Sequence, residues 1–189
     1  MPRNIVVLLA LAALVALAGC KRESPVAAAP VASAPVATPQ AATPKVTTPN
    51  TKFPSLKVQT LDGKTFDLAA QRGAWAIVNF WATWCGPCLK EMPELSALDA
   101  MREHIVVIGL AYEDTTAEAM RAFLVTHPVV YPIALVDVYN PPADFDTPRG
   151  LPFTYLIGPD GAVVKKYTGP VSARMLEEDI AAAGGPKAG

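Results

Sequence analysis

The stretch that decides the fold is residues 79–88, which read Asn79-Phe80-Trp81-Ala82-Thr83-Trp84-Cys85-Gly86-Pro87-Cys88. It joins an apolar run to a helical pattern that begins at Cys85. The start of a helix gathers unpaired backbone N–H groups and the positive end of the dipole, which favour a thiolate. Cys88 follows one turn later, close enough to attack a mixed disulfide on Cys85. The spacing predicts thiol–disulfide exchange, with Cys85 as the nucleophile and Cys88 as the resolving thiol.

This cysteine motif, Trp-Cys-Gly-Pro-Cys after an apolar strand, resembles the active site of thioredoxin. With Asn79 ahead of it and Glu91-Met92-Pro93-Glu94-Leu95 behind it, the sequence is similar to the ResA/TlpA family from Phe53 to the C-terminus. That family consists of membrane-anchored, extracytoplasmic thiol–disulfide oxidoreductases. The resemblance implies an α/β chain with the thioredoxin fold, a mixed central sheet flanked by helices, and an added N-terminal β-hairpin.

The residue pattern from 53 onward predicts the same architecture. Asp62-Gly63 predicts a tight turn between strands 58–60 and 65–68. We expect further strands at 75–80, 105–111, 133–136, 153–157 and 162–167, and helices at 85–101, about 114–126 and 172–182. In this order, strands alternate with helices, and a hairpin and a helix close the domain.

Two local features of this part of the chain lead to further expectations. Three- and four-residue steps predict a buried stripe on the first helix, formed by Cys88, Met92, Leu95, Leu98 and Met101. Residues 139–149 stand where relatives usually carry a short helix. Here Asn140 could cap a single helical turn with Pro141 at its first position.

The N-terminus predicts export and a lipid anchor. Ile5 to Ala18 is apolar, follows Arg3 and is too short to span a bilayer comfortably, so residues 1–19 are interpreted as a signal peptide. The end of this run, Leu17-Ala18-Gly19-Cys20, resembles a bacterial lipoprotein box, which implies cleavage before Cys20 and a diacylglycerol on its thiol. An uncleaved signal anchor is the alternative. The membrane is either the inner or the outer one, and Lys21 points weakly to the outer.

Residues 20–52 form the predicted linker, and residues 53–189 the thioredoxin-like domain. Six prolines spaced by Ala, Val and Thr between Ser24 and Thr51 predict a semi-rigid tether without a core. The domain holds 11 Lys and Arg against 16 Asp and Glu, a formal net charge of −5. Its basic residues do not cluster, so we expect no nucleic-acid partner.

The remaining site residues follow from the resemblance and from their positions. Gly86 and Pro87 stand between the cysteines as in reducing thioredoxins, and Trp84 offers an apolar contact beside them. Glu91, one turn after Cys88, is the candidate proton-exchanging carboxylate, because Asn79 occupies the position of thioredoxin's buried aspartate. Trp81 is assigned either to the core or to the site.

A second loop is also assigned to the site by resemblance. Gly150-Leu151-Pro152-Phe153-Thr154 resembles the loop that holds the family's cis-proline opposite the cysteines. The implied role of Pro152 is to keep the site open and to block metal ligation. The backbone of Leu151 would pair with an extended substrate strand.

With Cys20 assigned to lipid, Cys85 and Cys88 are the cysteines left to pair with each other. The expected cofactor is therefore none beyond this redox-active pair. A zinc half-site is the competing interpretation, but only His104 and His127 could complete it, and their spacing is unsuitable. We expect no metal.

The resulting hypothesis is a lipid-anchored reductant of disulfides in exported proteins. Family members serve cytochrome c maturation or copper-site assembly, and a membrane electron donor of the DsbD/CcdA type recharges them. The alternatives are an oxidant that inserts disulfides and a non-enzymatic lipoprotein that binds a metal or an assembly factor. A peroxidase is disfavoured because the chain lacks a Thr-x-x-Cys site.

Overall fold

The computed structural model describes residues 51–187. The predicted signal peptide, the lipidation of Cys20 and nearly all of the predicted linker lie outside these residues. In the described part of the chain, no helix has the length and apolar character needed to cross a membrane.

A five-stranded mixed sheet forms the centre of the domain, in the order β5-β4-β3-β6-β7. The inner strands β3 (Trp75–Trp81) and β4 (Ile105–Ala111) are parallel, and β4 is also parallel to the short edge strand β5 (Ile133–Leu135). On the other side, β6 (Phe153–Ile157) is antiparallel to β3 and to β7 (Val163–Thr168). The mixed sheet expected from the sequence is confirmed.

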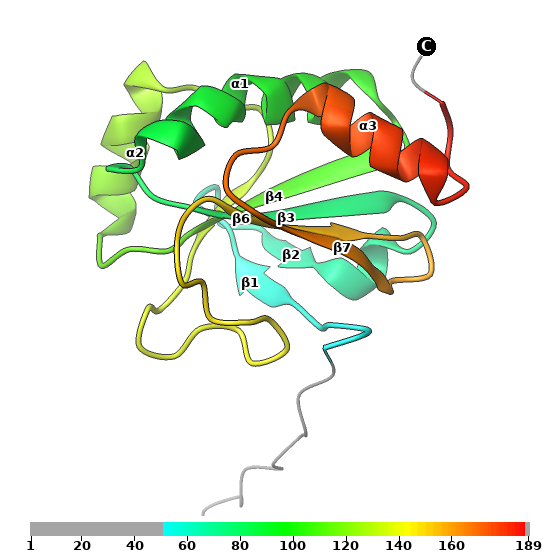
Figure 1. The fold of residues 1–189 in the computed structure, drawn as a ribbon. Helices are drawn as coiled ribbons and strands as arrows, with labels where there is room; N and C mark the ends of the chain where they lie inside the picture. The colour runs from blue at the N-terminus through cyan, green and yellow to red at the C-terminus, as the bar shows by residue number, and fades with distance from the viewer. Residues whose placement is uncertain (1–50, 188–189) are drawn as a thin grey trace, which may run out of the picture. The chain divides into compact units, whose positions relative to one another are not determined.

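Three helices cover one face of this sheet: α1 (Gly86–Met101), α2 (Ala117–Thr126) and α3 (Ala173–Ala182). Figure 1 shows α1 and α3 side by side above the strands and α2 at the left, and Met120 of α2 belongs to the same core as the residues of α1 and α3. The opposite face carries the N-terminal hairpin, β1 (Lys57–Gln59) and β2 (Thr65–Asp67), together with the 3₁₀ helix η1 (Leu68–Gln71). The added hairpin is therefore confirmed, and its strands pair Val58 with Phe66.

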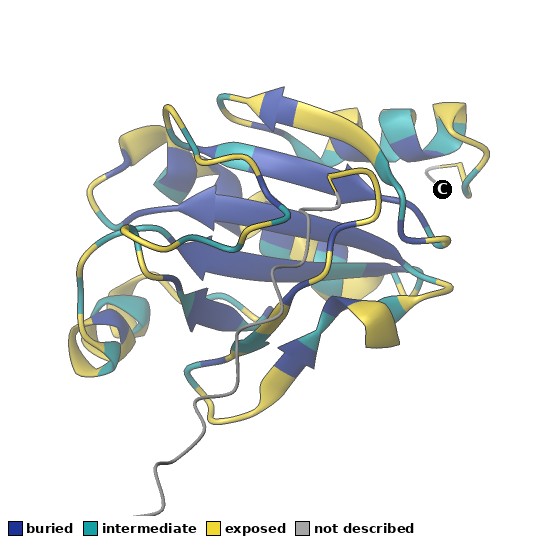
Figure 2. Ribbon diagram, turned by 90° about the horizontal axis from the view of Figure 1, so that it is seen from below, coloured by how far each residue is buried: buried dark blue, intermediate teal, exposed yellow. Residues whose placement is uncertain are grey.

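The alternation of side chains along β3 divides the interior into two cores. Trp75, Ile77 and Trp81 point toward the helices and belong to the helix-side core, whereas Ala76, Val78 and Phe80 belong to the hairpin-side core. All seven residues of β3 are buried, because helices cover one face and the hairpin with residues 137–150 covers the other. Figure 2 shows the central strands buried along their length. Trp81, left open by the sequence, is a core residue.

The loop that joins β5 to β6 does not contain the expected helical turn at Asn140. The Asn140 N–H instead donates to the Asp137 carbonyl, and the Phe145 N–H donates to the Pro142 carbonyl in a separate turn. Phe145 is buried, and its ring packs edge-on against Tyr155 at 4.9 Å between centroids. Pro142 disfavours helical backbone at Pro141, because the residue before a proline is pushed toward an extended conformation, and the buried Phe145 fixes the loop to the sheet instead.

Candidate active site

Cys85 is the N-cap residue of α1 and forms a disulfide with Cys88. Its backbone is extended, with φ −87° and ψ 95°, and its Sγ accepts a hydrogen bond from the Cys88 N–H at 3.3 Å. The Cα atoms of the two cysteines are 5.3 Å apart. Cys85 is 3% exposed and Cys88 is fully buried. The sulfur that the sequence predicts as the nucleophile therefore lies at the positive end of the helix, and it is slightly the more accessible of the two.

A carboxylate holds the loop that leads into Cys85. Glu113, just after β4, accepts from the Thr83 N–H at 2.7 Å and from the Thr83 hydroxyl at 2.8 Å. The Cys85 N–H donates to the Ala82 carbonyl, which closes the turn before the helix. One carboxylate oxygen of Glu113 thus holds the backbone of Thr83 and the other holds its side chain, two residues before the nucleophile. Glu113 had not been expected in the site, since it lies 30 residues away in the sequence.

The residues around the disulfide leave its outer side open. Gly86 and Pro87 are exposed and occupy the first turn of α1, where the missing N–H of proline leaves no bond unmade. Trp84 is 70% exposed. This exposed indole, one residue before Cys85, leaves an apolar surface open to solvent, and its role as a contact for a partner stays a prediction.

The Leu151–Pro152 peptide bond is cis. Phe80 pairs with Phe153, so Pro152 lies at the end of the sheet where β3 leads into the cysteine loop. Leu151 packs against the helix-side core, which includes both cysteines. The Pro152 carbonyl accepts from Gly169, whereas no hydrogen bond involves the backbone of Gly150 or Leu151 anywhere in residues 51–187. The structure therefore brings the proline loop and the disulfide to the same end of the fold.

Glu91 is buried on the same face of α1 as Cys88. It is 2% exposed, and its Oε2 accepts from the Val171 N–H at 2.8 Å. Its Oε1 accepts from Asn79 Nδ2, also at 2.8 Å. Burial raises the pKa of Glu91 from its ordinary 4.5 to about 7, and these two hydrogen bonds only partly oppose the shift. Glu91 can therefore both hold and release a proton near neutral pH, unlike a solvated helix residue.

Asn79 connects this carboxylate to the strand that follows the cis-proline. Its Nδ2 also donates to Thr154 Oγ1 at 2.9 Å, and Asn79 and Thr154 are opposite each other across β3 and β6. The Asn79 Oδ1 is buried and has no hydrogen-bond partner within residues 51–187. The sequence linked Glu91 to Asn79 as the replacement for a buried aspartate, but it gave no role to Thr154 and missed Val171. Strand pairing could have suggested Thr154, while nothing in the sequence points to Val171.

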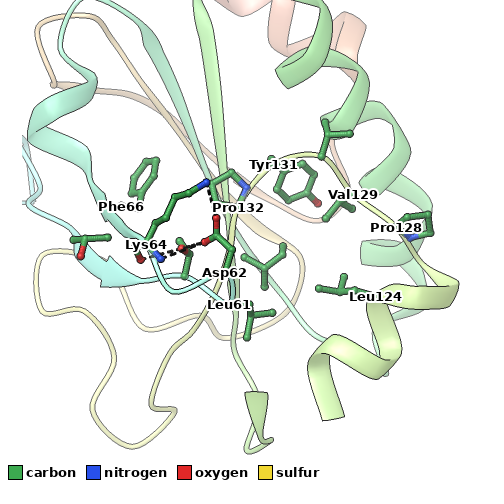
Figure 3. A pocket seen from close by; sticks show the side chains of 13 residues that line it. Leu61, Asp62, Lys64, Phe66, Leu124, Pro128, Val129, Tyr131 and Pro132 are labelled. Atoms are coloured by element: carbon green, nitrogen blue, oxygen red, sulfur yellow. Dashed lines mark hydrogen bonds and ion pairs between the residues drawn. The ribbon is translucent and has the colours of Figure 1, made fainter. Parts of the chain in front are cut away.

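Two more buried polar atoms lie near this network. The Tyr131 hydroxyl and the Trp81 Nε1 have no hydrogen-bond partners in the described residues. Burial, with the nearby Glu91 and Asp99 carboxylates, raises the pKa of Tyr131. Tyr131 also lines a cavity of about 500 Å³ between the hairpin turn and the segment after α2 (Figure 3). That cavity contains neither cysteine nor any residue of the proline loop, so it is separate from the site.

Among residues 51–187, no group of three or more His, Cys, Asp or Glu side chains is placed to hold a metal ion. His127 caps the C-terminus of α2, and its ring stacks on Phe123 at 4.2 Å between centroids. His104 lies in the turn between α1 and β4. The two histidines considered as zinc ligands therefore lie at or just after the C-terminal ends of α2 and α1.

Comparison with known proteins agrees with this geometry. Residues 49–178 match the AhpC/TSA family. The chain is 34% identical over 117 residues to the thiol-disulfide oxidoreductase ResA of Bacillus cereus, covering 61% of this chain and 67% of the relative. It is 35% identical over 109 residues to the thiol:disulfide interchange protein DsbE of Allochromatium vinosum, covering 57% of this chain and 59% of DsbE.

A solved structure shows the same fold. The thiol:disulfide interchange protein of Chlorobium tepidum, a thioredoxin family protein, superimposes with a TM-score of 0.57 at 26% identity, over 71% of this chain and 96% of that protein. The fold and the cysteine pair thus define a thioredoxin-fold protein of thiol–disulfide exchange, as the sequence predicted. The chain belongs to the AhpC/TSA family, and within it is a thiol–disulfide oxidoreductase of the ResA/DsbE type.

Proposed function

We propose that the protein reduces disulfides in exported proteins at the extracytoplasmic face of a membrane. The observation that carries the proposal is the position of Cys85 as the N-cap of α1, with the Cys88 N–H donating to its Sγ. The same helix end stabilises the Cys85 thiolate once the disulfide is reduced. Gly86 and Pro87 between the cysteines, with no histidine there, support a reductant rather than an oxidant.

The reaction begins when the Cys85 thiolate attacks one sulfur of a substrate disulfide. A mixed disulfide forms, and the second substrate sulfur leaves as a thiolate that takes a proton. Cys88 then loses its proton, with Glu91 as the acceptor, and its sulfur attacks Cys85 Sγ. The substrate sulfur that was attacked first leaves Cys85 as a thiolate and takes a proton, which releases the reduced substrate. The substrate gains two electrons and two protons, while the Cys85–Cys88 dithiol becomes the disulfide. A membrane dithiol donor of the DsbD/CcdA type would return it to the reduced form.

Two surface features support a polypeptide as the substrate. The unbonded backbone of Gly150 and Leu151 can pair with an extended chain beside the disulfide. Trp84 supplies the adjacent apolar contact. The substrate class we propose is the cysteine pair of an exported apoprotein, in cytochrome c maturation or copper-site assembly.

The reduction potential of Cys85/Cys88 tests the direction of the reaction. Equilibration of the full chain with glutathione or dithiothreitol buffers should give a value near or below about −230 mV, toward thioredoxin. A value near about −120 mV, typical of strong periplasmic oxidants, would replace the proposal by disulfide insertion. A cysteine pair with no reversible two-electron couple would rule out both enzymatic functions and leave the non-enzymatic lipoprotein that binds a metal or an assembly factor.

Lipid attachment at Cys20 is tested separately. Cells that express the full chain should incorporate labelled fatty acid into it, and the membrane fraction should contain it. Cys20→Ser should remove the label, because no thioether could form. Label that persists in Cys20→Ser would contradict attachment at this residue.

A further inference from the structure

A hollow of about 620 Å³ lies next to the cis-proline loop and has no role in the exchange reaction described above. Its lining comes from the loop before Pro152 and from the paired ends of β6 and β7, namely Asp146, Thr147, Arg149, Gly150, Phe153 and Thr168. We call it the Arg149 pocket.

The Arg149 pocket lies at the end of the sheet that carries the disulfide. Phe153 pairs with Phe80 on one side and with Thr168 on the other. Five residues after Phe80 the chain reaches Cys85. The residue next to Gly150, Leu151, packs against the core that contains both cysteines. A polypeptide held at Leu151 would therefore pass both the disulfide and this pocket.

The charges in the pocket are unbalanced toward positive. The carboxylate of Asp146 is already paired with Lys166, whose Nζ lies 2.6 Å from Asp146 Oδ2. This hydrogen bond lowers the pKa of Asp146. Arg149 is exposed, and no hydrogen bond or ion pair involves it within residues 51–187. The Thr147 hydroxyl likewise has no partner among these residues. Arg149 is thus an uncompensated cation at the rim of a domain whose formal net charge is −5.

The backbone beside Arg149 can accept a second chain. A Cβ added to Gly150 would meet no heavy atom within 4 Å, so the space above this residue is open. An extended substrate paired with Leu151 places side chains alternately on its two faces, at about 3.3 Å per residue. One residue near the attacked cysteine would then direct its side chain into the pocket. An arginine fork with a neighbouring hydroxyl suits a carboxylate, which it binds through two parallel hydrogen bonds.

We propose that the Arg149 pocket is a specificity subsite, in which Arg149 binds the carboxylate of an Asp or Glu close to the disulfide of a polypeptide substrate. This inference rests on the proposed reductase function and adds a sequence preference to it. The pocket selects among substrates without touching the reacting sulfurs, so it should change kcat/KM for charged peptides and not the redox potential.

The test uses the reduced full chain in detergent and a set of synthetic peptides with one intramolecular disulfide. The positions tested are the two residues before the attacked cysteine and the two residues after it. A single Glu, Gln or Lys is placed at each of these positions in turn. At one position, kcat/KM for the Glu peptide should exceed that for the Gln peptide by about 3- to 10-fold, as expected for a partly exposed charge pair. Salt at 0.5 M should reduce this ratio because it screens exposed charges.

Charge reversal supplies the decisive comparison. Arg149→Gln should abolish the Glu preference, and Arg149→Glu should replace it by a Lys preference at the same position. Arg72→Gln is the matched control, because Arg72 is exposed near Gly161, in the turn at the opposite end of β6. It removes the same charge and should leave the preference intact. A Glu preference unchanged in Arg149→Glu, or no preference at any position, would overturn the inference.

A binding measurement separates this inference from the reductase proposal. The same peptides with both cysteines replaced by serine are titrated against the full chain, with Trp fluorescence as the signal. The Glu peptide should bind the wild type more tightly than Arg149→Glu by a similar factor. If no peptide disulfide is reduced but this binding difference is present, the reductase proposal fails and the carboxylate subsite stands. Equal binding to both proteins would overturn the subsite, whatever the turnover.

Discussion

Asn79 Nδ2 donates a 2.8 Å hydrogen bond to Glu91 Oε1, which joins the central strand of the sheet to the helix that carries both cysteines. The same amide nitrogen donates to Thr154 Oγ1 at 2.9 Å, two residues after the cis-proline. The Asn79 amide nitrogen therefore donates to two acceptors, Glu91 Oε1 and Thr154 Oγ1, and these two hydrogen bonds fix the orientation of the amide. The three residues connect a titrating carboxylate to both segments that border the disulfide.

Glu91→Gln should remove a pH dependence from the stability of the oxidised protein. The pKa of Glu91 is raised in the folded state, so the folded chain binds this proton more tightly than the unfolded chain. Its contribution is full below pH 4.5 and is lost as pH rises through about 7. A shift of this size corresponds to at most about 3 kcal/mol.

Urea unfolding at pH 5 and pH 8.5 measures this effect. The wild type should lose about 1–3 kcal/mol more than Glu91→Gln between the two pH values. Gln has one acceptor oxygen for the two donors that Glu91 satisfies, the Val171 N–H and Asn79 Nδ2, which adds a loss that is the same at both pH values. Glu178→Gln, an exposed helix residue, should follow the wild type. Identical pH profiles for Glu91→Gln and the wild type would contradict a raised pKa at Glu91.

Asn79→Asp should make the site strongly sensitive to pH. It places a second carboxyl group against Glu91, and two carboxylates that share a buried site cannot both ionise without penalty. At pH 5 the pair retains a proton that can bridge the two groups, so the loss of stability should be small. At pH 8.5 the loss should exceed about 2 kcal/mol.

Thr154→Val is the matched control for Asn79→Asp. It removes the other hydrogen bond of Asn79 without adding charge, so it should lower stability by about 1 kcal/mol at both pH values. Urea unfolding gives both results. If Asn79→Asp lost the same amount at pH 5 and pH 8.5, the carboxyl groups would not interact as the geometry indicates.

Cys88→Ser should accumulate mixed disulfides on Cys85. The serine hydroxyl cannot displace the substrate, so the first intermediate of exchange persists. Non-reducing electrophoresis after incubation with a disulfide-bonded protein should show adducts that dithiothreitol removes. Cys85→Ser is the control and should give far fewer, because Cys88 is fully buried. Adducts formed mainly by Cys85→Ser would reverse the order of the two cysteines.

The cysteine motif and the helix after it could be predicted from sequence because their signals are local. Cys85, Cys88 and Glu91 share one face of a helix, and three- and four-residue spacing is enough to bring them together. The same spacing failed at Met101, which is 69% exposed at the last position of α1. Met101 belongs to neither of the two buried cores, so at this helix end periodicity alone does not decide burial.

The partners of Glu91 could not be predicted, because they depend on the assembled fold. Val171 lies 80 residues away and reaches Glu91 only when the segment before α3 packs on α1. The predicted helical turn at Asn140 was wrong for a related reason. Asn140 followed by proline is a common start of a helix. Here, however, Pro142 and the burial of Phe145 against Tyr155 determine the backbone of the loop. Tertiary packing overrides a single local signal where prolines leave few alternatives.

Gly109→Ala should lower the free energy of unfolding by about 1–3 kcal/mol through overpacking. Gly109 lies opposite Asn79 in the sheet, and a Cβ there would be 2.5 Å from Ile133 Cδ1 and 3.0 Å from both Trp81 Nε1 and Tyr131 Cε2. The two rings are buried and cannot move aside easily. Gly150→Ala is the control, because its Cβ would meet no atom within 4 Å, so its stability should be unchanged or slightly increased. Equal urea midpoints for the two variants would show that the rings above Gly109 are free to shift.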